Sequence, residues 1–139
     1  MPLAASLLAT ASAAIVLAFG LLHLFHTFRG NMLHPREPGV MEAMQQSGLR
    51  LTRQTTVWRA WTGFNASHGI ALILFGALYG YLALALPGVL FGSIILRAMG
   101  LAALLAYVGL SKLYFFRTPL RGVIVATVLY VAGLIAAAF

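Results

Sequence analysis

The chain has 139 residues, which is enough for one domain, and a formal net charge of +7 at pH 7. It is 62% hydrophobic and 8% charged, far from the roughly 25% charged residues of soluble domains, so we expect lipid to surround most of it. The chain has no cysteine, which excludes thiol catalysis, disulfide exchange and cysteine-based zinc or iron–sulfur sites.

The first apolar run covers residues 3–28 and predicts a membrane-spanning helix rather than a cleaved signal peptide. No lysine or arginine precedes it, and it continues past the length of a signal-peptide hydrophobic region. Three further runs, at about 57–86, 89–116 and 120–139, each supply the roughly 20 apolar residues that a spanning helix needs. We therefore predict an all-α integral membrane four-helix bundle, with residues 1–139 forming a single transmembrane domain.

The loops predict the orientation of these helices. Eight of the nine basic residues lie in residues 29–59 and 112–121, whereas Met1-Pro2-Leu3 and the turn at Pro87-Gly88 carry no charged side chain. The positive-inside rule places both basic loops in the cytoplasm and both termini on the opposite side. This location explains the positive charge, so no nucleic-acid partner is predicted.

The connection between the first two runs is the one long polar stretch. Pro38 suits the first position of a helix, and apolar residues then recur near helical spacing among polar ones, at Val40, Met41, Met44 and Leu51. This pattern indicates a short amphipathic helix on the cytoplasmic leaflet, ended or kinked at Gly48. An irregular basic loop is the alternative.

Two G-x-x-x-G pairs predict a close helix contact. Gly76 and Gly80 form one pair, and Gly88 and Gly92 form the other. Both lie beside Pro87, so close backbone approach there would form a compact hairpin of the second and third helices.

Polar residues inside apolar helices are the candidates for function, because they are costly in lipid. On the first helix His23 and His26 share a face, and on the second helix Trp61, Asn65 and His68 share another. Opposed faces would bring these residues together in the cytoplasmic half of the bundle.

This set of residues permits three interpretations. His23, His26 and His68 could bind zinc or copper as a divalent metal. His68 with His23 or His26 could clasp a b-type haem. Alternatively, Asn65 and His68 form hydrogen bonds between helices, and His23 and His26 are interfacial side chains with wet polar tips.

Arg97 is the one basic residue deep within a predicted span. An arginine near the bilayer centre costs about 2.5–3.5 kcal/mol on insertion scales. The chain has no aspartate, and its two glutamates, Glu37 and Glu42, lie in the first cytoplasmic loop. Thr10, Ser12, Tyr130 and backbone carbonyls are the neutral partners expected at its depth. A bound anion, a lipid headgroup, a quinone carbonyl or another subunit's acidic residue could also satisfy Arg97, as could snorkelling into thinned lipid.

Catalysis is not favoured by these residues. No carboxylate lies within a span for proton-coupled transport, and the adjacent Ser67 and His68 do not face each other on a helix. We therefore expect a role other than that of an enzyme.

The segment from Trp58 to Gly69 reads Trp-Arg-Ala-Trp-Thr-Gly-Phe-Asn-Ala-Ser-His-Gly, and Leu-Phe-Gly-Ala-Leu-Tyr-Gly-Tyr follows it closely. Together with His26-Thr27-Phe28-Arg29-Gly30 and Pro35-Arg36, it resembles an uncharacterised family of small four-span bacterial membrane proteins. The resemblance implies the bacterial inner (cytoplasmic) membrane and the same four-helix layout. It implies no activity.

The sequence therefore favours an accessory or assembly subunit of a membrane complex, in contact with lipid and with other membrane subunits or a second copy of itself. One alternative is a haem- or metal-binding redox protein using His23, His26 and His68. Another is a binder of lipid or quinone anchored by Arg97, with Trp61, Asn65 and His68 as further ligand-binding candidates.

Overall fold

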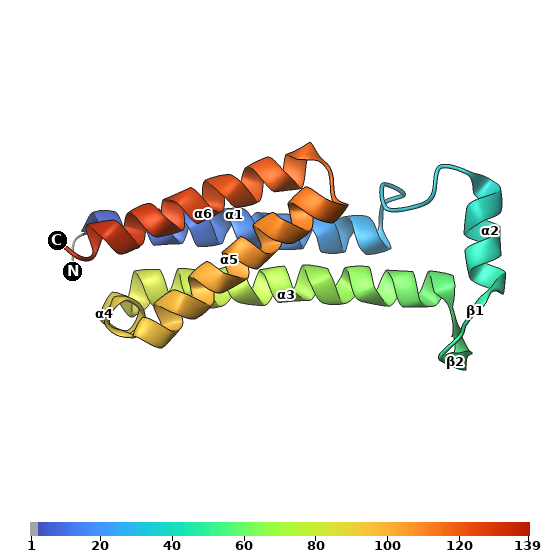
Figure 1. Cartoon of the computed structure of the whole chain (residues 1–139), viewed down its shortest axis with the longest axis horizontal. Helices are drawn as coiled ribbons and strands as arrows, with labels where there is room; N and C mark the ends of the chain where they lie inside the picture. Colours follow the sequence, from blue (N-terminus) through green and yellow to red (C-terminus); the bar gives the residue numbers. More distant parts are fainter. Residues whose placement is uncertain (1–2) are drawn as a thin grey trace. The chain divides into compact units, whose positions relative to one another are not determined.

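The structure is a computed structural model that describes residues 3–139, which are mostly helical (Figure 1). Four helices are long and apolar enough to cross a membrane: α1 (Leu3–Phe28), α3 (Val57–Ala85), α5 (Ile94–Tyr114) and α6 (Arg117–Ala136). The prediction of an all-α protein with four such helices is confirmed. The sides that the termini face stay a prediction, and Met1 and Pro2 lie outside the described residues.

The predicted third helix is wrong at its start, because the chain breaks there into two helices. A short helix α4 (Pro87–Gly92) comes first, and α5 begins after Ser93. The Ser93 hydroxyl accepts a hydrogen bond from the Leu96 backbone N–H at 3.3 Å, so it caps α5 as serine does at many helix N-termini.

The fourth helix lies three residues earlier than predicted, from Arg117 to Ala136 instead of 120–139. Pro119 falls in its first turn, where backbone N–H groups have no partner within the helix. Proline therefore does not prevent the helix from beginning at Arg117.

The polar connection between α1 and α3 contains more secondary structure than the sequence predicts. The short helix is confirmed as α2 (Pro38–Gln46), which has no buried residue. Strands β1 (Gly48–Leu49) and β2 (Thr52–Thr56) then form an antiparallel hairpin that the sequence pattern does not predict. Its turn, Arg50-Leu51, lacks the glycine, asparagine or proline that usually marks a hairpin.

The described chain divides into two compact units. The large unit contains the residues up to Phe19 together with Leu72–Phe139, and the small unit is Gly20–Ala71. The predicted single domain of residues 1–139 stays a prediction.

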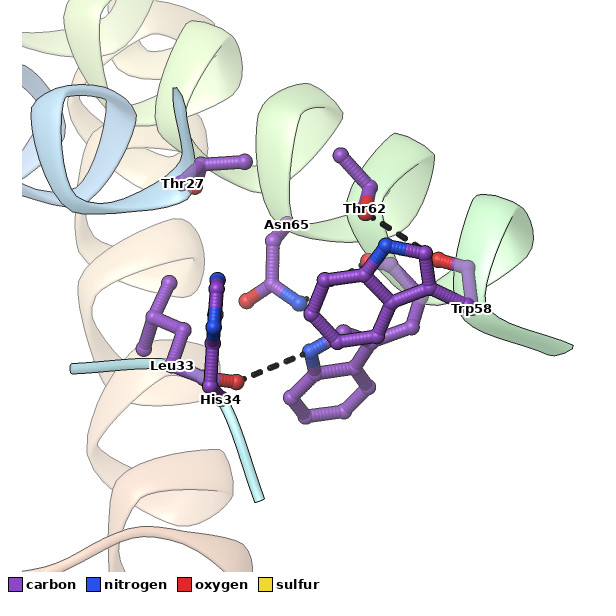
Figure 2. Close-up of a pocket in the computed structure, with 7 residues that line it drawn as sticks. Thr27, Leu33, His34, Trp58, Thr62 and Asn65 are labelled. Carbon is purple, nitrogen blue, oxygen red and sulfur yellow. Dashed lines mark hydrogen bonds between the residues drawn. The ribbon is translucent and has the colours of Figure 1, made fainter. Parts of the chain in front are cut away.

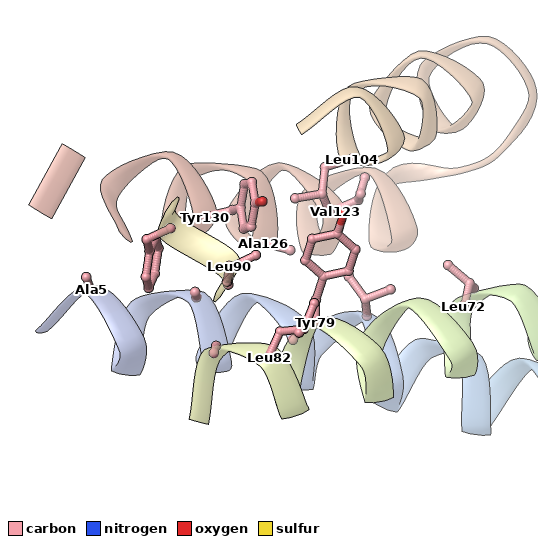
Figure 3. Close-up of a cluster of buried hydrophobic side chains, with 14 residues drawn as sticks. Ala5, Leu72, Tyr79, Leu82, Leu90, Leu104, Val123, Ala126 and Tyr130 are labelled. Atoms are coloured by element: carbon pink, nitrogen blue, oxygen red, sulfur yellow. The ribbon is translucent and has the colours of Figure 1, made fainter. Parts of the chain in front are cut away.

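The large unit has a continuous apolar core (Figure 3). Ala5, Ala9 and Ala13 lie on one face of α1 and are at most 2% exposed. This row of small side chains allows close backbone approach: a Cβ on Gly133 of α6 would lie 3.1 Å from the Ala5 carbonyl oxygen. Small residues thus allow the backbones of α1 and α6 to come close, as they do between helices of membrane proteins.

The predicted glycine contact between the second and third helices is wrong. A Cβ added to Gly88 or to Gly92 would have no neighbouring atom within 4 Å. Gly76 packs against α1 instead, because a Cβ there would lie 2.7 Å from the Ala13 carbonyl oxygen. The close approach therefore joins α3 to α1.

Candidate functional site

A hydrogen-bonded polar cluster joins α1 and α3 within the small unit. The Asn65 side-chain amide donates to the Trp61 carbonyl at 2.9 Å, and its Oδ1 lies 3.0 Å from His23 Nε2. Because the amide nitrogen is the donor to Trp61, Oδ1 must accept, and His23 carries a proton on Nε2. Asn65 therefore fixes the orientation of the His23 ring.

His68 completes this cluster. Its ring meets His23 edge-to-face, with the ring centroids 4.8 Å apart. The helices approach closely here because Gly69 has no side chain: a Cβ would lie 3.2 Å from the Leu24 backbone nitrogen. The structure thus brings together His23, Asn65 and His68. This agrees with the prediction that the polar faces of the two helices meet.

The third predicted histidine ligand, His26, does not complete a metal-binding group. Among residues 3–139 no three histidine, cysteine, aspartate or glutamate side chains form a group that could hold a metal ion. His26 packs edge-to-face on Phe25, with the ring centroids 5.3 Å apart. Its Nδ1 is buried with no hydrogen-bond partner among the described residues. Metal binding at these histidines stays a prediction.

The direct contact of His23 with His68 also bears on the haem interpretation. An iron between two imidazoles lies about 2 Å from each ring nitrogen, so the ring centroids must be roughly 6 Å apart with a porphyrin between them. Edge-to-face rings with centroids 4.8 Å apart have no room for that plane. This arrangement does not favour a haem between the two rings.

Trp61 has a structural contact that the sequence does not reveal. Its indole N–H donates to the Leu33 carbonyl at 3.1 Å, and His34 packs edge-to-face on Trp58 with centroids 5.0 Å apart (Figure 2). The small pocket between these residues has a cavity volume of about 10 Å³, roughly the space of one water. His34 was missed because no spacing pattern connects it with the helix that it contacts.

Arg97 is the second candidate site, and it belongs to the large unit. The Tyr130 hydroxyl donates to the Arg97 backbone carbonyl at 3.3 Å, and the Tyr79 hydroxyl donates to the Leu96 carbonyl at 2.9 Å. Both tyrosines therefore hold the backbone of α5 and not the guanidinium group. Within residues 3–139, Arg97 Nε is buried without a hydrogen-bond partner.

The predicted neutral partners do not satisfy this nitrogen. The hydroxyl oxygens of Thr10 and Ser12 are themselves buried without a hydrogen-bond partner in the described part of the chain. Among the described residues, the Tyr130 hydroxyl bonds to the backbone carbonyl of Arg97 and not to its Nε. Within the described part of the chain, none of these three side chains therefore bonds Arg97 Nε.

Asn65→Leu is expected to lower the free energy of unfolding by about 1–2 kcal/mol, because it leaves the His23 N–H unpaired in an apolar setting. Ser67→Ala is the matched control on α3, since the exposed Ser67 hydroxyl bonds the Phe64 carbonyl of its own helix. Thermal unfolding in detergent measures both variants. Equal stability of the two would contradict the role of Asn65.

No protein-family model, curated protein or solved structure matches this chain.

Proposed function

We propose that this protein is a small accessory subunit of a membrane complex in which Arg97 pairs with an acidic group of a different protein. The proposal rests on the half-buried Arg97 side chain, whose Nε has no hydrogen-bond partner among residues 3–139. This side chain belongs to a helix that is long and apolar enough to cross a membrane. A cation in that setting is expected to face a partner or a polar cavity.

The composition of the chain supports an external partner. It has only two acidic residues, Glu37 and Glu42, and neither belongs to a candidate span. A second copy has the same spans, so it could not supply a carboxylate at the depth of Arg97. An acidic residue from another protein would offset much of the roughly 2.5–3.5 kcal/mol cost of placing arginine in the membrane.

The tyrosine contacts support a fixed position for this charge. Tyr79 and Tyr130 bond the carbonyls of Leu96 and Arg97, so they fix the first turns of α5 from two other helices. A guanidinium on a fixed backbone loses less conformational entropy when it pairs with a carboxylate. This arrangement suits a docking contact.

Arg97→Leu is expected to abolish recovery of the partner when a tagged chain is purified from its native membrane in mild detergent. Arg97→Lys keeps the charge and should retain part of the recovery. Met99→Leu is the matched control, since Met99 is an exposed apolar residue of the same helix. Quantitative mass spectrometry of the bound proteins and lipids measures the result.

Unchanged recovery of all proteins with Arg97→Leu would refute the proposal. Loss of lipid alone would instead support the lipid or quinone binder. A charge exchange gives the decisive positive result. Arg97→Glu should lose the partner, and a partner protein whose acidic residue is replaced by arginine should bind the Arg97→Glu protein again.

As a second candidate we propose that His23 and His68 hold a divalent metal in the bacterial inner membrane. The contact between their rings and the bond from His23 to Asn65 support it, because they place two imidazoles side by side on a fixed framework. Elemental analysis and the visible spectrum of the purified protein test this function. Absence of bound metal would exclude metal binding at His23 and His68, and a haem absorption band would contradict the packing of their rings.

A further inference from the structure

An open groove lies in the small unit where the chain leaves α1 and enters α2. Its cavity volume is about 530 Å³, within the roughly 300–1,000 Å³ range of small-molecule sites. Three side chains with hydrogen-bond donors and four apolar ones line it: Asn31, His34 and Arg36, with Met32, Pro35, Pro38 and Met41. The lining is amphipathic and includes no carboxylate.

The wall of this groove is held in place by contacts within the small unit. The His34 backbone N–H donates to the Asn31 carbonyl at 3.0 Å, which closes a turn. The Trp61 indole bonds the Leu33 carbonyl, and the His34 ring packs on Trp58. The groove is therefore tied to the first turns of α3 and does not depend on a free loop.

The surroundings of the groove match an amphipathic anion. It lies just after α1, a candidate membrane span, and Met32 on its wall is 74% exposed. Residues 29–59 contain five arginines and two glutamates. Anionic lipids of the cytoplasmic leaflet attract such basic segments, and guanidinium groups bind phosphate through paired N–H donors.

We infer that this groove binds the headgroup of an anionic phospholipid. Arg36 holds the phosphate, Asn31 and His34 offer further donors, and Met32 and Met41 contact the glycerol and the upper acyl chain. The inference requires α1 to cross a membrane and is independent of the proposed partner of Arg97.

Lipid titration of the purified protein, followed by native mass spectrometry, tests the inference with phosphatidylglycerol and with zwitterionic phosphatidylcholine as probes. Arg36→Gln is expected to weaken binding of phosphatidylglycerol about fivefold, as loss of one basic contact near a membrane surface predicts. Arg53→Gln is the matched control, because Arg53 is an exposed arginine of the same unit that does not line the groove. It should leave phosphatidylglycerol binding unchanged.

Met32→Gln provides a second variant that does not depend on charge, and its exposure means that the fold should tolerate it. We expect it to weaken phosphatidylglycerol binding as well. Equal losses in Arg36→Gln and Arg53→Gln would overturn the inference in favour of general electrostatic attraction. Displacement of the lipid by millimolar glycerol 3-phosphate would overturn it in favour of a free-phosphate site.

Discussion

Gly76→Ala is expected to cause a large loss of stability, lowering the free energy of unfolding by about 2–3 kcal/mol as overpacking does. The added Cβ would lie 2.7 Å from the Ala13 carbonyl oxygen, and equally from the Leu17 backbone nitrogen and Cβ. Because two of these atoms are backbone, no change of rotamer relieves the clash, and the two helix backbones must separate. Thermal unfolding in detergent measures the loss.

Gly80→Ala is the matched control for this prediction, one turn further along the same helix. Its Cβ would lie 3.6 Å from the Ala13 Cβ, which is an ordinary van der Waals contact. Alanine also has a better helix propensity than glycine, by up to about 1 kcal/mol. We expect Gly80→Ala to be neutral or stabilising. A Gly76→Ala protein as stable as Gly80→Ala would show that α1 and α3 do not pack as described.

Tyr130→Ala is expected to destabilise the large unit by about 2–3 kcal/mol, below the usual 3–5 kcal/mol for removing a buried aromatic side chain. Lipid is as apolar as the protein interior, so moving an apolar side chain between them changes the free energy little. The cavity that the missing ring leaves therefore accounts for most of the lost stability. Tyr130 is 2% exposed and meets Tyr79 edge-to-face, with centroids 6.0 Å apart (Figure 3).

Two further variants separate the ring of Tyr130 from its hydroxyl. Tyr130→Phe keeps the ring and loses only the bond to the Arg97 carbonyl, so its expected cost is about 0.5–1 kcal/mol. Tyr114→Ala removes a tyrosine that is 74% exposed and should have little effect. If Tyr130→Phe were as damaging as Tyr130→Ala, the hydroxyl and not the packing would hold this site together.

The wrong prediction of a close helix contact at Gly88 and Gly92 shows what a sequence motif does not specify. Both G-x-x-x-G pairs look alike in sequence, yet only Gly76 of the four glycines meets a neighbouring backbone closely. A small-residue motif permits close approach but does not select the helix that approaches. Gly76 approaches α1 at Ala13 and Leu17. Alanine and leucine are too common in apolar helices for that site on α1 to be recognised beforehand.

The polar contacts show a similar limit. His23 and Asn65 were predicted to share a region, and they do, because each lies on a polar face of its own helix. The bond from Trp61 to the Leu33 carbonyl was not predictable, since its acceptor is a backbone atom that every residue possesses. The hairpin at Arg50-Leu51 was missed for a related reason, because its turn carries no conformationally specialised residue.

The sequence by itself determined that four helices are long and apolar enough to cross a membrane, and it located them to within a few residues apart from the break at Ser93. An apolar helix in lipid satisfies its backbone hydrogen bonds internally, so its existence depends on local composition alone. Only the tertiary structure decided which helix faces meet. A helix that is apolar on nearly every side has no sequence pattern that fixes its rotation about its own axis. The lack of a hydrogen-bond partner for Arg97 Nε among residues 3–139 and the contact between His23 and His68 both depend on that rotation.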